Sequence, residues 1–227
     1  MIIERFLQFK EQLGNEVFSR LNEFFDREKE IFYNEKIPYW INKGYPNDEA
    51  VIKARQGWVS TIGRNLEKVI EILIEDFCNE NNLKVTNDKT LKKQNLSTEL
   101  DFVKRLILVN FGEYALLPDG DIIIYKLFNN QPKIIAILSV KNSFRERYTE
   151  TPYWKLKLSQ NQITKHIKVF MITPDKDDEI SYSNNPRKSR IVMEYELDGI
   201  YLAKDNFDSS RKIKSINSLI NDLKELL

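Results

Sequence analysis

The spacing of apolar residues predicts two helical regions in the first third of the chain. From residue 1 to about residue 35, apolar side chains recur mostly every three or four positions, which is typical of an amphipathic helix. A break is expected around Pro38, Gly44 and Pro46. Asn47 or Asp48 can cap a second helical region. That region runs to about residue 82 and is open to interruption near Gly57 or Gly63.

The rest of the chain alternates between strand and helix patterns. Consecutive apolar residues predict buried strands over 121–128, 133–140 and 168–172, with a turn at 129–132 between the first two. Ser143 with Glu146 forms a capping-box pattern, and Pro152 fits a second helix start. We expect a loop over 84–100, a short strand over 106–109, a polar loop over 174–189, a closing hairpin from 190–195 and 199–202, and an amphipathic helix over 215–227.

This order of elements predicts an α/β fold with a central mixed sheet flanked by helices and an N-terminal helical lobe. The length of 227 residues suits one domain, residues 1–227. Within it we expect a helical lobe over 1–60, a core over 61–175 and a C-terminal hairpin and helix over 176–227.

Composition narrows the chemistry. The net charge is +1, so a nucleic-acid surface would have to come from local clustering of basic residues. The single histidine and single cysteine argue against zinc. His166 and Lys168 have the His-x-Lys spacing of phospholipase D, but Thr173 stands where its aspartate is needed and there is no second copy. One cysteine and no long apolar run predict a cytoplasmic protein without a membrane segment.

A set of polar residues at the ends of two predicted strands could cleave phosphodiesters. Asp119 and Asp121 stand at the entry of the first strand, and Ser139 and Lys141 at the exit of the second. Carboxylates bind Mg²⁺, which activates water, and a lysine stabilises developing charge. All four share one face only if Asp121 lies opposite Ser139 or Lys141, so we expect a turn of about three or five residues.

The same residues resemble a known superfamily. Pro118-Asp-Gly-Asp121 followed by Ile-Ile-Ile-Tyr, and later Ile-Leu-Ser139-Val-Lys141, resemble the PD-(D/E)xK nucleases, and the segment 141–148 resembles Type II restriction endonucleases. Residues 60–172 carry the likeness. It implies a restriction-endonuclease-like core and Mg²⁺-dependent cleavage of double-stranded DNA. Length and a Lys/Asn/Ile-rich composition resemble SwaI-like enzymes, which implies a short palindromic site, AT-rich and of eight bases.

The sequence departs from the superfamily at Ser139, where an Asp or Glu is expected. As metal ligands we therefore predict Asp121 with Glu67, Asp119 or Glu146. Glu67 lies in a helix that resembles the first core helix of the superfamily. We assign Asp121, Lys141, Glu67 and Ser139 to catalysis. Asp121, Lys141 and Glu67 could instead be solvated surface charges. The capping box alone could explain Glu146.

Basic and aromatic residues beyond Lys141 predict the DNA-binding surface, since Arg and Lys hold phosphates or read base edges. The candidates are Asn142, Ser143, Arg145, Arg147, Tyr148, Lys155, Arg187 and Lys188. A palindromic site implies a homodimer, with the N-terminal helices as the expected contact. A cognate DNA methyltransferase is expected as a functional companion. The alternatives are another nuclease of this fold, for repair or junction resolution, and a DNA-binding module with a decayed site.

Overall fold

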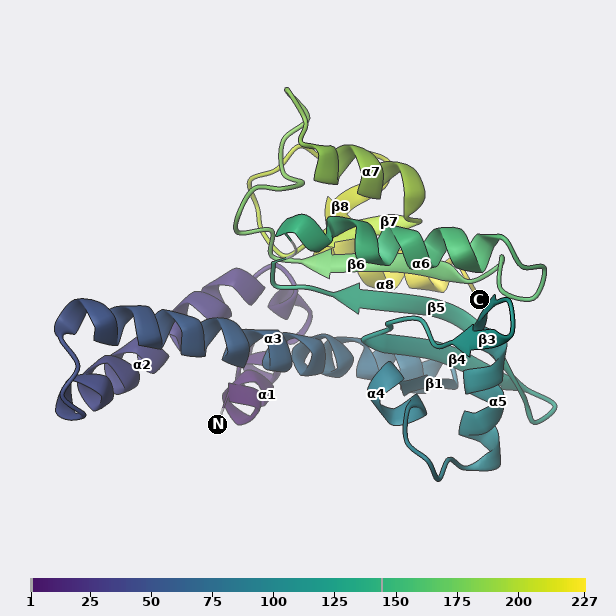
Figure 1. Cartoon of the computed structure of the whole chain (residues 1–227), viewed down its shortest axis with the longest axis horizontal. Helices are drawn as coiled ribbons and strands as arrows, with labels where there is room; N and C mark the ends of the chain where they lie inside the picture. Colours follow the sequence, from purple (N-terminus) through teal and green to yellow (C-terminus); the bar gives the residue numbers. More distant parts are fainter. Residues whose placement is uncertain (1, 144) are drawn as a thin grey trace.

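The architecture is a mixed sheet of six strands with helices on both faces (Figure 1). The computed structural model describes residues 2–143 and 145–227, without the side chains of 15, 145 and 146. The strand order is β1-β4-β5-β6-β7-β8. β1 (Leu83–Thr86), β4 (Ile122–Phe128) and β5 (Gln131–Val140) pair antiparallel. β5, β6 (Lys168–Thr173), β7 (Gly199–Leu202) and β8 (Ile213–Ser215) pair parallel. The predicted α/β class with a mixed sheet is confirmed.

Each face of the sheet buries its own apolar cluster. One face packs against the N-terminal helices and α8 (Leu219–Lys224), and its cluster includes Ile122, Ile124 and Leu138. The other packs against α5 (Thr98–Ile107), α6 (Glu150–Ser159) and α7 (Lys188–Glu196), and its cluster includes Ile123 and Ile137. Because both faces are covered, the central strands carry apolar residues at consecutive positions, as the sequence indicated.

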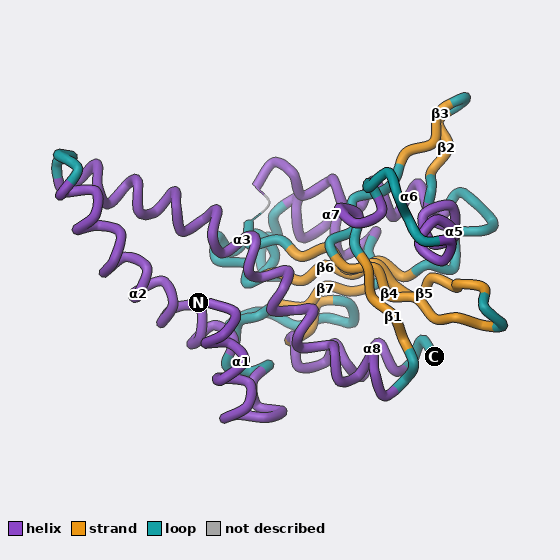
Figure 2. Tube along the Cα trace, turned by 90° about the horizontal axis from the view of Figure 1, so that it is seen from below, coloured by secondary structure: helices purple, strands orange, loops and turns teal. Residues whose placement is uncertain are grey.

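The N-terminal helices are α1 (Ile2–Leu13), the 3₁₀ turn η1 (Gly14–Val17), α2 (Leu21–Asn42) and α3 (Asn47–Glu80). They cover one face of the sheet through the second half of α3, whereas α2 and the first half of α3 project away from the sheet as an arm (Figures 1 and 2). The predicted break at Pro38 is wrong, because α2 continues through it. A proline costs a helix one hydrogen bond, and solvent can hydrate the freed carbonyl on this open arm. The helix ends just before Gly44, whose φ of +91° suits glycine.

The loop predicted over 84–100 contains β1, α4 (Asp88–Leu91) and the start of α5. β1 is half polar, and its conformation is set by pairing with β4, a contact distant in sequence. Ser97 caps α5 by accepting a hydrogen bond from the Leu100 amide. The strand expected over 106–109 is instead the end of α5 followed by β2 (Val109–Phe111), which forms a separate hairpin with β3 (Tyr114–Leu116).

The C-terminal third also differs from the expected closing hairpin. Residues 190–195 belong to α7, and β7 pairs with β6 and β8 instead. Ser189, Arg190 and Met193 are the buried positions of α7, a helical spacing that the β-branched run Ile-Val obscures. The 3₁₀ turn η2 (Arg145–Thr149) precedes α6, and η3 (Ile216–Ser218) precedes α8. Within the part of the chain described, no helix combines the length and apolarity that a membrane span requires.

Candidate active site

The β4–β5 hairpin reaches the predicted register by an unexpected route. Its turn has two residues, Asn129 and Asn130, both with positive φ, so the expected odd-length turn is wrong. Such a turn alone would place Asp121 opposite Leu138. A bulge leaves Ile135 unpaired between the Tyr125–Ile134 and Ile124–Ala136 pairs and shifts the register by one. Ile122 then faces Leu138, and one step further Asp121 faces Ser139.

The register places Asp121, Ser139 and Lys141 on the same face of the sheet. Ile123 and Ile137 lie in the cluster beneath α6, and side chains two positions along a strand share a face. Asp121 is 9% exposed, and its Oδ2 accepts hydrogen bonds from the Val140 amide at 2.7 Å and from Lys141 Nζ at 3.1 Å. The expected juxtaposition of these residues is confirmed. An Asp–Lys pair therefore stands at the ends of two paired strands.

Ser139 is held by the helix that covers it. The residue is buried, and its Oγ accepts a hydrogen bond from Thr151 Oγ1 at 2.9 Å. Thr151 is in the first turn of α6, directly after Glu150. The missing acid at Ser139 thus coincides with the start of a helix that carries a carboxylate. Sequence reasoning missed Glu150; the superfamily departure at Ser139 together with Pro152 was the signal that could have found it.

Three further acids lie around the start of β4, and each is paired with a lysine. Glu67 Oε2 of α3 contacts Lys89 Nζ at 2.5 Å. Lys92 Nζ binds Asp88 Oδ2 at 2.6 Å and Asp119 Oδ1 at 3.3 Å. Hydrogen bonding to Glu67 raises the pKa of Lys89, and the charges of Glu67, Asp121 and Asp88 act in the same direction. Sequence reasoning missed Asp88, Lys89 and Lys92, because they lie in the segment read as loop.

Gly120 fixes the position of this acidic group. Its carbonyl accepts a hydrogen bond from the Asp88 amide at 3.0 Å, which joins α4 to the start of β4. A Cβ at this position would lie 3.0 Å from Ile137 Cγ2 and 3.1 Å from Ile123 Cγ1. The close approach of these two side chains therefore favours a glycine between Asp119 and Asp121.

The donors fit a hard divalent cation by their chemistry, since Mg²⁺ prefers carboxylate oxygens. Both hydrogen bonds that Asp121 accepts fall on Oδ2. Its Oδ1 accepts none from the described residues. In the described part of the chain, no group of three Asp, Glu, His or Cys residues is close enough to hold an ion. Asp121 is thus the natural anchor, and the neighbouring acids are engaged by lysines.

The predicted DNA-binding residues surround the exit of β5. Asn142 and Ser143 are half-buried directly after Lys141, Arg147 is exposed, and Tyr148 packs partly against the core beneath α6. Arg145 and Glu146 belong to η2, but their side chains lie outside the described residues. η2 packs against α7, where Lys188 is exposed and Arg187 pairs with Glu179.

Lys155 does not fit the DNA-binding role expected from its sequence position. Its side chain is only 13% exposed, and its Nζ lies 2.6 Å from Asp198 Oδ2 and donates to the Ile167 carbonyl at 3.0 Å. These contacts attach α6 to the segments around β6. The reason is its helical position: Lys155 points toward the sheet, whereas the sequence alone suggested a solvated face. His166 is likewise structural, with Nε2 3.1 Å from the Ile134 carbonyl.

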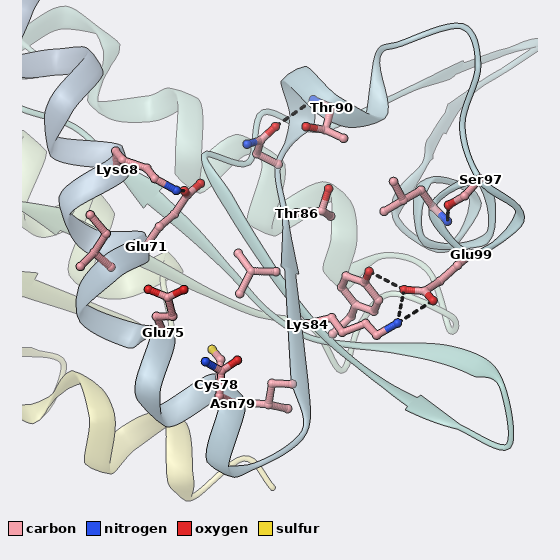
Figure 3. A pocket seen from close by; sticks show the side chains of 16 residues that line it. Lys68, Glu71, Glu75, Cys78, Asn79, Lys84, Thr86, Thr90, Ser97 and Glu99 are labelled. Carbon is pink, nitrogen blue, oxygen red and sulfur yellow. Dashed lines mark hydrogen bonds and ion pairs between the residues drawn. The ribbon is translucent and has the colours of Figure 1, made fainter. Parts of the chain in front are cut away.

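A cavity of about 700 Å³ lies beside this site, between α3, β1 and the start of α5 (Figure 3). Lys84 and the Tyr125 hydroxyl both donate to Glu99 in its wall. Burial, the hydrogen bond to Glu99 and its charge raise the pKa of Tyr125, which keeps the phenol protonated. The described lining does not include Asp121, Ser139 or Lys141. The reacting groups therefore lie outside this cavity.

Comparison with known proteins defines the class as the type II restriction endonucleases, which are site-specific deoxyribonucleases. The BsaWI restriction endonuclease type 2 family model matches residues 99–222. The chain therefore belongs to the BsaWI family of type II restriction endonucleases.

Named relatives agree with this family. A type II restriction enzyme of Methanocaldococcus jannaschii, MjaVIP, is 48% identical over 211 residues, covering 92% of this chain and 93% of that one. HpyAORF263P, a type II restriction enzyme of Helicobacter pylori, is 54% identical over 187 residues, 82% of this chain and 95% of its own. A crystal structure of a pre-specific BsaWI–DNA complex matches with a TM-score of 0.46 and 14% identity, over 83% of this chain and 67% of that one. This last likeness is too distant to transfer residue positions.

Proposed function

We propose that this chain hydrolyses phosphodiester bonds in double-stranded DNA at a short palindromic site, with Mg²⁺ as cofactor. The observation that carries the proposal is the common face of Asp121, Ser139 and Lys141, with Asp121 Oδ2 3.1 Å from Lys141 Nζ. Family membership makes DNA the substrate class. It also favours an active enzyme over a DNA-binding module with a decayed site, and a restriction enzyme over a repair or junction-resolving nuclease.

The proposed chemistry divides between the ion and the protein. When bound, Mg²⁺ would lower the pKa of a coordinated water and screen phosphate charge. Asp121 would anchor the ion through carboxylate oxygen. Lys141 would place a positive charge beside the attacking water and the oxygens that become more negative in the transition state. Both groups are largely shielded from solvent, which strengthens such interactions.

We propose that a helix supplies the second metal-binding acid beside Asp121. Glu67 belongs to α3 and Glu150 to the first turn of α6, and these two helices cover opposite faces of the sheet. Asp119 and Glu146 remain predicted ligands from the sequence. Glutamine substitution at each of these positions ranks them. Replacement of a true metal ligand should raise the Mg²⁺ concentration needed for half-maximal cleavage, whereas replacement of a surface acid should leave that concentration unchanged.

A homodimer is proposed because a palindromic site requires two-fold symmetry. The arm supports this role, since it exposes the large apolar side chains Ile41, Val51, Ile52 and Val59. Light scattering should give twice the mass of one chain, and I52E/V59E should lower it. A monomeric wild type that cuts both strands would contradict this part of the proposal.

Digestion of plasmid DNA with Mg²⁺, followed by mapping of the ends, tests the function as a whole. Discrete fragments with one common end sequence are expected, and the AT-rich eight-base site stays a prediction that the same map checks. D121A and K141A should yield no fragments while still retarding a duplex that contains the site. A smear of random cuts, or full cleavage by either variant, would contradict the proposal.

A further inference from the structure

Two lysines on one short segment form ion pairs with the acids around the candidate metal site. Lys89 binds Glu67, and Lys92 bridges Asp88 and Asp119. Both follow β1 and precede α5, whereas their partners come from α3, α4 and the entry of β4. The charge of Asp121 also raises the pKa of Lys89, so this ammonium lies within the field of the central carboxylate.

The lysines and the acids differ in their freedom to move. The side chains of Lys89 and Lys92 are 64% and 52% exposed, whereas those of Glu67 and Asp88 are 24% and 11% exposed. The backbone of the segment is fixed, because Asn87 accepts a hydrogen bond from the Thr90 amide and the Asp88 amide binds the Gly120 carbonyl. The ammonium groups can therefore swing toward solvent while the carboxylates of Glu67 and Asp88 stay in place.

The electrostatics favour an exchange of cations. A lysine beside a carboxylate offsets its charge when no metal ion is bound, but it also competes with a metal ion for the same oxygens. DNA brings phosphates to the same place, and phosphates are strong acceptors for lysine. An ammonium displaced from an acid by a metal ion can therefore bind a phosphate of the substrate.

We propose that Lys89 and Lys92 are exchangeable counter-ions of the metal-binding acids, which move onto DNA phosphates when the divalent ion binds. This inference rests on the proposed function of the site. It makes metal and DNA binding mutually favourable, because each ligand removes a cost of binding the other. The two lysines are thus positioning residues that couple the two ligands.

Binding of Mn²⁺ to the DNA-free protein, measured by calorimetry, tests the first half. K89Q and K92Q should each raise the affinity about two- to fivefold, the size of one lost exposed ion pair. K84Q is the matched control, because Lys84 pairs with Glu99 outside the site and is 48% exposed. K89R keeps the charge and should bind Mn²⁺ as the wild type does. Unchanged or weaker binding by both K89Q and K92Q, or an equal rise in K84Q, would overturn the proposal.

The salt dependence of DNA binding tests the second half. With Ca²⁺ present and a duplex containing the mapped site, each of K89Q and K92Q should reduce the slope of log affinity against log salt by about one. K84Q should keep the wild-type slope. Wild-type slopes in both site variants would overturn the transfer to phosphate. Failure of the proposed function can be told apart from failure of this inference. In that case the wild type would cut no DNA with Mg²⁺, whatever the binding results.

Discussion

Two partly buried Asp–Lys pairs lie at the ends of strands of the same sheet, and they differ in how many carboxylate oxygens accept hydrogen bonds. Asp198 accepts from Lys168 at Oδ1, and from the Val169 amide and Lys155 at Oδ2, over 2.6 to 3.1 Å. Asp121 accepts from Val140 and Lys141, both at Oδ2. Its Oδ1 has no recorded partner among the described residues, and further acids lie nearby.

The difference separates a structural pair from the pair that we propose to be catalytic. Both carboxylate oxygens of Asp198 accept hydrogen bonds. These bonds attach α6 and the start of β6, so neither oxygen is left for a ligand. Asp121 keeps an oxygen for an ion and stands where two strands end. From the sequence, Lys141 was assigned to catalysis and Lys155 to the DNA-binding surface. Their partners tell them apart.

The largest expected effect comes from D121N, which removes the charge but keeps an acceptor for the Val140 amide. Cleavage under single-turnover conditions should fall about 10³-fold or more, because several kcal/mol of charge stabilisation are lost. D121N also leaves Lys141 without its charged partner, so the rate is compared at a temperature where circular dichroism shows the variant to be folded. D198N, made in parallel, should keep cleavage near the wild-type rate. A D121N enzyme that cuts at the wild-type rate would remove Asp121 from the site.

The second effect is on stability. D198N or K155Q should lower the free energy of unfolding by about 2–4 kcal/mol, since each leaves a largely buried charge without its partner. Urea unfolding monitored by circular dichroism measures this. The salt slope of DNA binding by K155Q should equal that of the wild type. A lower slope with full stability would restore Lys155 to the DNA interface.

The same pair predicts a pH dependence. Burial acts to raise the pKa of Asp198, but hydrogen bonds from Lys155 and the Val169 amide outweigh it, and the pKa lies below its ordinary value. A carboxyl with a lowered pKa stabilises the fold above its unfolded value of about 4, and this contribution is lost as the pH falls through the folded value. The stability difference between wild type and D198N should therefore be constant from pH 7 to 5 and shrink below about pH 4. A difference that grows on acidification would contradict this assignment.

The smallest expected effect concerns the hairpin turn. Asn129 and Asn130 have φ of +50° and +64°, and glycine is favoured at the second position of such a turn. N130G should change the free energy of unfolding by at most about 1 kcal/mol and the melting temperature by at most about 4 °C, because relief at the positive φ is offset by the greater freedom of glycine in the unfolded chain. Cleavage should not change, because N130G keeps both the two-residue turn and the bulge at Ile135, which together set the register. Loss of cleavage in N130G would show that the turn controls the site.

The sequence predicted the hairpin, its register and the Asp121–Lys141 pair, because apolar runs and strand alternation are local signals. It predicted the register for the wrong reason, since the bulge at Ile135 depends on packing against both faces. β1 and α4 were missed, because β1 is fixed by pairing with β4, and α4 is joined to the start of that strand by the hydrogen bond from the Asp88 amide to the Gly120 carbonyl. Asp88, Lys89 and Lys92 were missed for the same reason, because they lie in α4 or directly after it. The role of Lys155 depends on Asp198, a partner that spacing along the chain does not reveal.

The most direct test of the account compares K141Q with K155Q in single-turnover cleavage of a duplex that contains the mapped site. K141Q should lose about 10³-fold or more in rate at a temperature where it is folded, because the charge beside the reacting phosphate is removed. K155Q should cut within about threefold of the wild-type rate at a temperature where it is folded, a difference below about 1 kcal/mol. Equal losses in both variants, or a K141Q enzyme as fast as the wild type, would contradict the central claim.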